Sequence, residues 1–340
     1  MNRRPGYANL DEDDVRVRPA RGTRPRTRRR PAHEDAAEAF VAAVDRGRYG
    51  TLLDDGPGQR TVTAMRAREL GRHSVVVGDR VALAGDISGE PGTLARIVRV
   101  EPRKSVLRRS ADDTDPVERV IVANADQLVI VTALADPPPR PRLIDRFLVA
   151  AYDAGLSPLL VLTKADLAPA APILDVYGPL GIPHVVLGHP LTPARLDPLR
   201  EALAGRVSVL VGHSGVGKST LINALIPGAD RAVGAVSPVT GRGRHTSSSV
   251  VALPLPGEGW LIDTPGLRGF GLAHVAPERV VRAFPDLAPG TLACPRGCTH
   301  LEPDCALDDW VRDQGGDSRL VQRLDSLRRL LRSREGDDTS

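Results

Sequence analysis

Lysine is rare in this 340-residue chain. Of its 46 basic residues, three are lysine, namely Lys104, Lys164 and Lys218, and the rest are arginine. Cysteine occurs three times, always between residues 294 and 305, which excludes a disulfide-stabilised scaffold and indicates a reducing compartment. No apolar run approaches the roughly 18–20 residues that span a bilayer. The first residues also lack the apolar core of a signal peptide. We therefore expect a cytoplasmic protein without a membrane partner.

The excess positive charge is concentrated at the N-terminus. Residues 1–34 contain ten arginines and five acidic residues, whereas the other 306 residues contain 36 basic and 37 acidic ones. Such a segment has too little apolar surface to fold, so we expect residues 1–46 to form a disordered tail. A polyphosphate partner would suit it, since each neutralised phosphate releases counterions. A solvated tail without a partner is the alternative.

Residues 47–112 are expected to form a small β-barrel, with the oligonucleotide-binding barrel among the candidates. Tyr49 is the single aromatic residue of this region, so nucleic acid would be bound by arginine and backbone groups and not by base stacking. The barrel prediction rests on four short segments separated by turns rich in glycine, proline and aspartate, at 48–53, 61–66, 79–84 and 94–100.

Residues 113–275 show a different pattern, in which apolar strands alternate with helices. This alternation predicts a mostly parallel sheet covered on both faces. Helices are predicted at 142–154 and 219–226. The predicted strands are 128–132, 159–162, 184–187, 207–211 and 260–262.

Residues 276–340 are expected to form a third domain, which holds a Cys/His loop and a final helix at 317–335. The helix is amphipathic and is expected to pack on the protein itself. Its apolar residues recur at helical spacing, at Leu320, Leu324, Leu327 and Leu331.

The strongest motif is Gly-His-Ser-Gly-Val-Gly-Lys-Ser at residues 212–219, directly after the strand at 207–211. It matches the phosphate-binding pattern G-x-x-x-x-G-K-[ST] in the strand–loop–helix context that this pattern requires. Its glycines let backbone N–H groups close around phosphates, and the helix N-terminus adds a favourable dipole. We expect Lys218 to reach the terminal phosphates and the Ser219 hydroxyl to bind Mg²⁺.

A second motif, Asp-Thr-Pro-Gly at residues 263–266, follows the strand at 260–262. An aspartate at a strand end, downstream of a phosphate loop, is placed to hold the Mg²⁺ shell. Asp263 is therefore a candidate Mg²⁺ residue, and a simple Asp-Thr-Pro-Gly turn is the alternative.

A third motif, Thr-Lys-Ala-Asp at residues 163–166, ends the strand at 159–162. Asp166 can accept hydrogen bonds from both N1–H and the 2-amino group of guanine, a donor pair that adenine lacks. The motif therefore indicates GTP and not ATP. In an ordinary GTPase it comes after the phosphate loop, whereas here it comes first. The same sheet results if the old termini are joined and the chain is cut in a surface loop, so the order predicts a circularly permuted domain.

The segment between the phosphate loop and Asp263 contains Gly-Arg-Gly-Arg-His-Thr and is expected to be a switch that orders on a γ-phosphate. Thr246 is the candidate for sensing Mg²⁺. Leu267 follows Gly266 at the place where a Ras-type enzyme has the glutamine that orients water. His245 is the candidate for that role, and a surface histidine without a catalytic role is the alternative.

The last motif gathers every cysteine of the chain with one histidine. Three cysteines and a histidine within twelve residues are what a closed structural zinc site needs, with no position left for a catalytic water. A redox pair of Cys294 with Cys298 is the alternative. The loop has little apolar content, so we expect it to need the metal to fold.

Together these motifs resemble the RsgA (YjeQ) family of circularly permuted GTPases that depend on the small ribosomal subunit. The resemblance runs from about residue 49 to about residue 310. Besides the three nucleotide motifs it rests on the switch segment, on Asp-Thr-Pro-Gly-Leu-Arg-Gly-Phe-Gly-Leu, on Phe284-Pro285-Asp286 and on the Cys/His loop.

The resemblance implies an oligonucleotide-binding barrel, a permuted α/β P-loop GTPase domain and a C-terminal zinc-binding domain. It also implies that the chain binds the small ribosomal subunit and its rRNA late in maturation and hydrolyses GTP to GDP there, with Mg²⁺ bound beside the nucleotide and one structural Zn²⁺. We expect a monomer. The alternative is an rRNA-binding assembly module in which the nucleotide only tunes affinity. Leu267 favours this alternative, whereas Lys218, Ser219 and Asp263 favour the enzyme.

The family's loop serine near the guanine is replaced by Gly188-His189 after the strand at 184–187, and we assign no guanine contact there. The candidate catalytic residues are His245, Lys218 and Thr246, and the candidate Mg²⁺ residues are Ser219, Thr246 and Asp263. The implied zinc ligands are Cys294, Cys298, His300 and Cys305. The implied GTP-binding residues are Thr163, Lys164, Ala165, Asp166, Gly212, His213, Ser214, Gly215, Val216, Gly217, Lys218, Ser219 and Thr220.

Overall fold

The computed structural model describes residue 33 and residues 36–54, 59–70, 74–109, 119–229, 250–264, 272 and 275–335. The expected switch residues His245 and Thr246, the positions Gly266 and Leu267, and the first 32 residues of the expected tail lie outside these ranges. Residues 35–340 form one unit by their contacts. The predicted domain boundaries between residues 112 and 113 and between residues 275 and 276 stay predictions.

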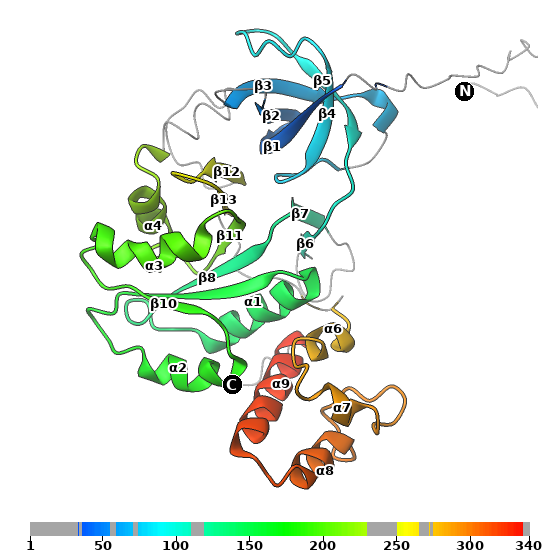
Figure 1. The fold of residues 1–340 in the computed structure, drawn as a ribbon, viewed down its shortest axis with the longest axis vertical. Coiled ribbons are helices and arrows are strands. Elements are labelled where there is room, and N and C mark those ends of the chain that lie inside the picture. Colours follow the sequence, from blue (N-terminus) through cyan, green and yellow to red (C-terminus); the bar gives the residue numbers. More distant parts are fainter. Residues whose placement is uncertain are drawn as a thin grey trace, which may run out of the picture. The chain divides into compact units, whose positions relative to one another are not determined.

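Five strands close the N-terminal barrel, drawn in blue to cyan in Figure 1. They pair in the order β1-β2-β3-β5-β4, and β4 pairs back with β1. The β3–β5 pair is parallel and the others are antiparallel, which is a five-stranded closed barrel of the predicted oligonucleotide-binding type. The strands are β1 (Ala37–Asp45), β2 (Arg48–Asp54), β3 (Gln59–Arg66), β4 (Arg80–Gly85) and β5 (Ala95–Val100).

The barrel begins at Ala37 and not at residue 47, so the end of the predicted tail was wrong. Strand β1 is buried on both faces: Ala39 and Val41 lie in the barrel core, whereas Phe40 and Ala42 lie in the core of the following sheet. A strand buried on both faces lacks the apolar–polar alternation that marks a strand in a sequence. Its alanine-rich sequence shows no such alternation, and these residues were therefore assigned to the tail.

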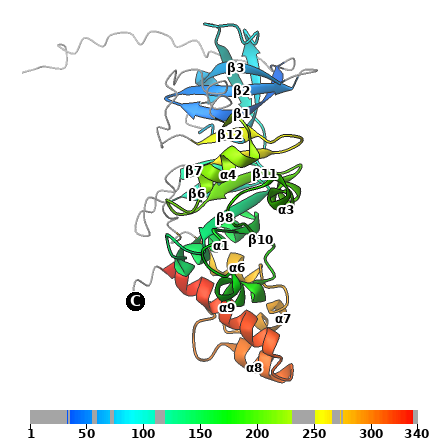
Figure 2. The same ribbon diagram turned by 90° about the vertical axis from the view of Figure 1, so that its left-hand side faces the viewer.

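The predicted parallel sheet follows, in the order β10-β9-β8-β11-β13, with β12 added antiparallel to β13. Sequence patterning missed β12. This strand also pairs with β1 at Ala43–Val251, so the barrel and the sheet are continuous (Figure 2). The strands are β8 (Gln127–Ala133), β9 (Ser157–Thr163), β10 (His184–Val186), β11 (Val207–Val211), β12 (Val251–Pro254) and β13 (Trp260–Asp263). A separate hairpin of β6 (Val106–Arg109) and β7 (Arg119–Ala123) precedes them.

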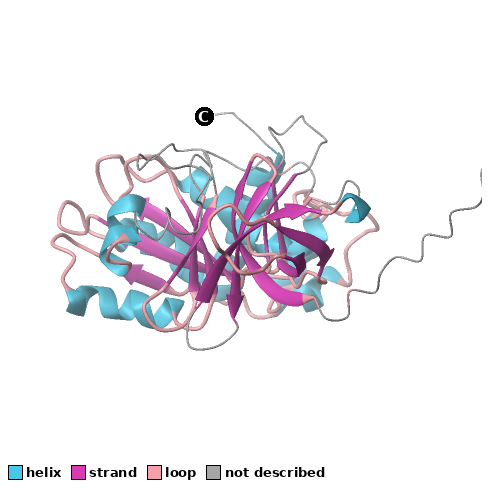
Figure 3. Ribbon diagram, turned by 90° about the horizontal axis from the view of Figure 1, so that it is seen from above, coloured by secondary structure: helices cyan, strands magenta, loops and turns pink. Residues whose placement is uncertain are grey.

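Helices, cyan in Figure 3, flank these strands. Helix α1 begins at Pro141, whose fixed φ suits the first turn, and ends before Gly155 in the left-handed conformation that glycine adopts without strain. None of the described helices is long and apolar enough to cross a lipid bilayer. The helices of this part are α1 (Pro141–Ala154), α2 (Ala171–Tyr177), the 3₁₀ turn η3 (Gly178–Leu180), α3 (Pro193–Leu203) and α4 (Lys218–Leu225).

The C-terminal segment is helical and ends on the predicted amphipathic helix. Its helices are α6 (Pro277–Val281), α7 (Ala288–Thr291), α8 (Ala306–Asp313) and α9 (Ser318–Glu335). Helix α9 contacts α1, α6, α8 and η3. Leu324, Leu327 and Leu331 are buried in the main core and Leu320 packs against it, which confirms that this helix packs on the protein itself.

Candidate functional site

The phosphate loop lies at the carboxyl end of β11, between β8 and β13 of the parallel sheet, and leads directly into α4, which begins at Lys218. Its glycines are required by the backbone. Gly215 and Gly217 have φ of +82° and +95°, a conformation that side chains disfavour. A Cβ on Gly212 would lie 2.3 Å from the Val131 carbonyl oxygen. The loop therefore passes so close to β8 that only glycine fits at position 212.

Lys218 bends back over this loop. Its ammonium donates hydrogen bonds to the carbonyl oxygens of Gly212 at 2.5 Å and His213 at 2.9 Å. Burial lowers the pKa of Lys218, and the nearby Asp263 carboxylate raises it. Ser219 and Thr220, in the first turn of α4, are exposed. An ammonium, two exposed hydroxyl residues and a helix N-terminus thus lie together at this loop, and such groups suit a polyphosphate.

Asp263 ends β13 next to this loop. Strand β13 pairs in parallel with β11, with Asp263 opposite Leu210. The adjacent Thr264 hydroxyl donates a 2.6 Å hydrogen bond to the Leu210 carbonyl oxygen and so fixes the end of the strand. The structure therefore places the predicted Mg²⁺ residue Asp263 close to Lys218. The last two residues of the motif, Pro265 and Gly266, lie outside the described residues.

The Thr-Lys-Ala-Asp motif begins at the carboxyl end of β9, on the far side of β8 from the phosphate loop. The Thr163 hydroxyl donates a 2.7 Å hydrogen bond to the Val216 carbonyl oxygen and so joins this motif to the phosphate loop. Lys164 has a positive φ of 57°, and its ammonium donates to the Asp136 carbonyl oxygen. The Thr-Lys-Ala-Asp motif and the phosphate loop, which begin 49 positions apart in the sequence, thus lie side by side.

Asp166 is held by a turn that the sequence analysis left without a role. The His189 backbone N–H donates a 2.6 Å hydrogen bond to Asp166 Oδ1, and this bond is the main cause of the lowered pKa of Asp166. Arg195, at the start of α3, donates to the carbonyl oxygens of Gly188 at 3.3 Å and His189 at 3.2 Å. No sequence pattern marks these contacts, because they depend on how β10 pairs with β9.

The four Cys/His side chains converge in space. The Nδ1 atom of His300 lies 3.6 Å from the sulfur of Cys294 and 3.7 Å from those of Cys298 and Cys305, and the sulfurs of Cys294 and Cys305 are 3.9 Å apart. A tetrahedral ion with bonds of ~2.3 Å to sulfur and ~2.0–2.1 Å to nitrogen places its ligand atoms about 3.6–3.8 Å apart. The cluster therefore fits a tetrahedral metal ion.

The backbone of His300 makes two hydrogen bonds that shape this cluster. The His300 N–H donates to the Cys298 sulfur at 3.3 Å, and Arg328 donates to the His300 carbonyl oxygen at 3.2 Å. Burial raises the pKa of the Cys298 thiol to about 12, so a thiolate forms here near neutral pH only with a cation beside it. All three cysteines are free, as a metal site requires.

The comparisons with known proteins agree with this geometry. The sequence profile of the RsgA GTPase family matches residues 100–273. A small ribosomal subunit biogenesis GTPase RsgA from Pseudomonas aeruginosa is 41% identical over 269 residues, which cover 76% of each chain. The chain belongs to the RsgA GTPase family. A relative of the same name from Gemmatimonas aurantiaca is 39% identical over 266 residues, 75% of this chain and 85% of the relative.

Two solved structures share the fold. YjeQ from Thermotoga maritima has a TM-score of 0.60 and 25% identity, with 87% of this chain and 98% of that chain covered. YloQ, described as a circularly permuted GTPase, has a TM-score of 0.62 at 22% identity, with 92% and 99% covered, and supports the fold alone. The predicted family, the permuted GTPase fold and the class of enzyme, a GTPase, are confirmed.

Proposed function

We propose that this chain binds the small ribosomal subunit, acts in its late maturation and hydrolyses GTP to GDP and phosphate while docked. The hydrogen bond from Thr163 to Val216 carries the nucleotide part of the proposal, since it fixes the guanine motif against the phosphate loop. The relatives' name, small ribosomal subunit biogenesis GTPase, supports the ribosomal part.

Each site residue is assigned a role by its position and chemistry. Lys218 stabilises the charge on the terminal phosphates, and Asp166 accepts hydrogen bonds from the guanine edge. Mg²⁺ would be held by Ser219, Asp263 and Thr246, and when bound it neutralises charge on the phosphate oxygens. His245 is proposed to orient the attacking water, because Leu267 cannot.

The Cys/His cluster is proposed to hold one structural Zn²⁺. The donor set of three sulfurs and one imidazole nitrogen is a common set for zinc, and it leaves no open position. The ligands lie on a loop that leads into α8, whose first residue follows Cys305. The metal would therefore fix the C-terminal segment and would not take part in the chemistry.

Contact with rRNA is proposed for the barrel, through arginine and backbone groups. Both aromatic residues of the barrel strands are buried: Tyr49 lies in the barrel core, and Phe40 stacks on Trp260 with ring centres 4.7 Å apart. A base-stacking surface would need exposed aromatic rings. We also propose that the protein is cytoplasmic and monomeric.

Co-sedimentation with small ribosomal subunits tests the partner. We expect subunits to bind the protein at least about fivefold more tightly with a non-hydrolysable GTP analogue than with GDP, because switch segments order on the γ-phosphate. Thr246→Ala is expected to abolish this difference. Equal affinity of the wild-type protein in the two nucleotide states, or no binding in either, would contradict the proposal.

A further inference from the structure

Helix α9 carries an arginine on its buried side. Arg323 is only 8% exposed, although an arginine on an amphipathic helix is normally solvated. Its guanidinium forms two 2.7 Å hydrogen bonds with the Asp286 carboxylate and lies 4.6 Å from the centre of the Phe284 ring. These contacts fix its orientation within the C-terminal segment.

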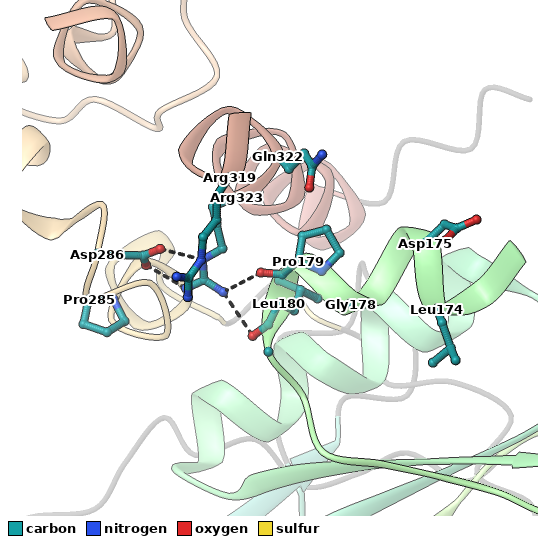
Figure 4. A pocket seen from close by; sticks show the side chains of 11 residues that line it. Leu174, Asp175, Gly178, Pro179, Leu180, Pro285, Asp286, Arg319, Gln322 and Arg323 are labelled. Atoms are coloured by element: carbon teal, nitrogen blue, oxygen red, sulfur yellow. Dashed lines mark hydrogen bonds and ion pairs between the residues drawn. The ribbon is translucent and has the colours of Figure 1, made fainter. Parts of the chain in front are cut away.

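The remaining nitrogen of Arg323 reaches into the GTPase domain. Its Nη1 donates hydrogen bonds to the carbonyl oxygens of Pro179 at 3.2 Å and Leu180 at 3.0 Å, both in η3. Figure 4 shows this guanidinium between Asp286 and η3. It lines an open cleft of about 890 Å³ between α9 and the α2–η3 segment. Arg323 therefore joins Asp286, α9 and η3 through one side chain.

A second arginine of α9 reinforces the same contact. Arg329 pairs with the buried Asp145 of α1 at 3.1 Å, and its guanidinium lies 5.0 Å from the centre of the Tyr177 ring. Tyr177 in turn donates a 2.8 Å hydrogen bond to the Pro141 carbonyl oxygen. Both arginines therefore hold residues 177–180, where α2 ends and η3 begins.

The held segment leads directly to the turn that orients Asp166. Only residues 181–183 separate η3 from β10, which is the edge strand of the sheet and pairs with β9 alone among the described strands. After β10, the Leu187 carbonyl oxygen accepts the Ala165 N–H at 3.1 Å, and the His189 N–H binds Asp166 at 2.6 Å. A three-residue edge strand is weakly held by itself, so its position depends on its anchored ends.

We propose that Arg323 is a positioning residue for the guanine-binding half of the site, which it holds in place through η3, β10 and the turn at 188–189. The inference rests on the proposed role of Asp166 in reading guanine. Because coupling between two sites is reciprocal, a partner that displaces α9 would loosen the guanine nucleotide, and bound nucleotide would stabilise α9. The C-terminal segment thereby sets how fast GDP leaves.

Dissociation rates of GDP and IDP from the wild-type protein and three variants test this role. IDP lacks the 2-amino group, so the ratio of the two rates reports how well Asp166 is oriented. Arg323→Ala is expected to release GDP at least about fivefold faster and to shrink the ratio towards one. The rate of GTP hydrolysis in a single turnover should stay within about twofold, because that rate excludes GDP release and Arg323 does not contact the phosphate loop. The exposed Arg312→Ala, in α8, is the matched control and should leave both rates unchanged.

The conservative variant distinguishes geometry from charge. A lysine at position 323 keeps the charge but cannot span the carboxylate and two carbonyl groups, so Arg323→Lys should also release GDP faster. Wild-type behaviour of Arg323→Lys, or an unchanged GDP/IDP ratio in Arg323→Ala, would overturn the proposal. If the wild-type protein itself does not discriminate GDP from IDP, the assignment of Asp166 fails, and the proposal fails with it.

A measurement on the wild-type protein covers the case in which the variants do not fold. We expect GDP to slow hydrogen–deuterium exchange of the amides of α9 at 319–330, whereas inorganic pyrophosphate, which occupies the phosphate loop alone, should not. Equal protection by both ligands, or by neither, would overturn the coupling.

Discussion

Replacing Lys218 by alanine is expected to lower the rate of GTP hydrolysis by at least about a hundredfold, the usual cost of removing one stabilising group from a charged transition state. The ammonium is held over the phosphate loop by two carbonyl oxygens, where it can contact the terminal phosphates of a bound nucleotide. Phosphate release at saturating GTP and Mg²⁺ measures the effect.

The chain offers a matched control for this variant. Lys104 is one of the two other lysines and is exposed, so Lys104→Ala should retain wild-type turnover. Lys218→Arg should also be inactive, because a planar guanidinium cannot take the place of a compact ammonium within the loop. Turnover by Lys218→Ala above about one tenth of the wild-type rate would contradict the assigned role.

Replacing Cys305 by serine is expected to remove the metal and unfold the loop that holds it. Structural zinc sites contribute about 10–16 kcal/mol of binding free energy in small zinc-binding peptides, far more than this short loop could recover from other contacts. Cys305 is 3% exposed and directly precedes α8. Metal content by mass spectrometry should fall from one equivalent to none, and the fluorescence of Trp310 on α8 should change.

The histidine ligand has a matched control of its own. His300→Gln should lose the metal, whereas His184→Gln, at an exposed position of β10, should retain one equivalent. A wild-type protein that holds no metal under reducing conditions, with a disulfide between Cys294 and Cys298 forming on oxidation, would contradict the metal site and support the redox alternative.

Loss of the metal should also weaken the binding of guanine nucleotide. Helix α8 is tied to α9 by the ion pair of Arg328 with Asp308 at 2.5 Å, and Arg328 also binds the His300 carbonyl oxygen. Unfolding the metal loop would therefore loosen the helix that carries Arg323. The Cys/His loop, α9 and η3 are thus connected by side-chain contacts of Arg328 and Arg323.

The sequence predicted the parts of the fold and site that have local signatures. Thr163, Gly212 and Asp263 each lie at or directly after the carboxyl end of an apolar strand, and strands of this kind are recognisable from composition and turns alone. A small β-barrel was predicted from four such segments, one strand fewer than the five observed, and the permuted domain was predicted from the order of the nucleotide motifs. Family membership was predicted because the motif order is unusual and the Cys/His loop accompanies it.

The remainder depends on tertiary contacts that no local pattern records. Strand β1 was missed because it is buried on both faces, with Val41 in one core and Phe40 in another. The bond from His189 to Asp166 depends on the register of β10 on β9, and a short edge strand has little pattern of its own. The helical spacing of the leucines at 317–335 does not distinguish Arg323 from the other arginines of that helix, and only the packed structure shows that it is buried.

Turnover of GTP by the purified protein, measured alone and with small ribosomal subunits at low salt, decides whether the chain is a subunit-stimulated GTPase. We expect slow turnover by the protein alone and a large rise with subunits, absent in Lys218→Ala, because the docked partner completes a site that lacks the usual glutamine. Flat, slow turnover with nucleotide-dependent binding intact would contradict a subunit-stimulated enzyme and favour an rRNA-binding module that the nucleotide only tunes.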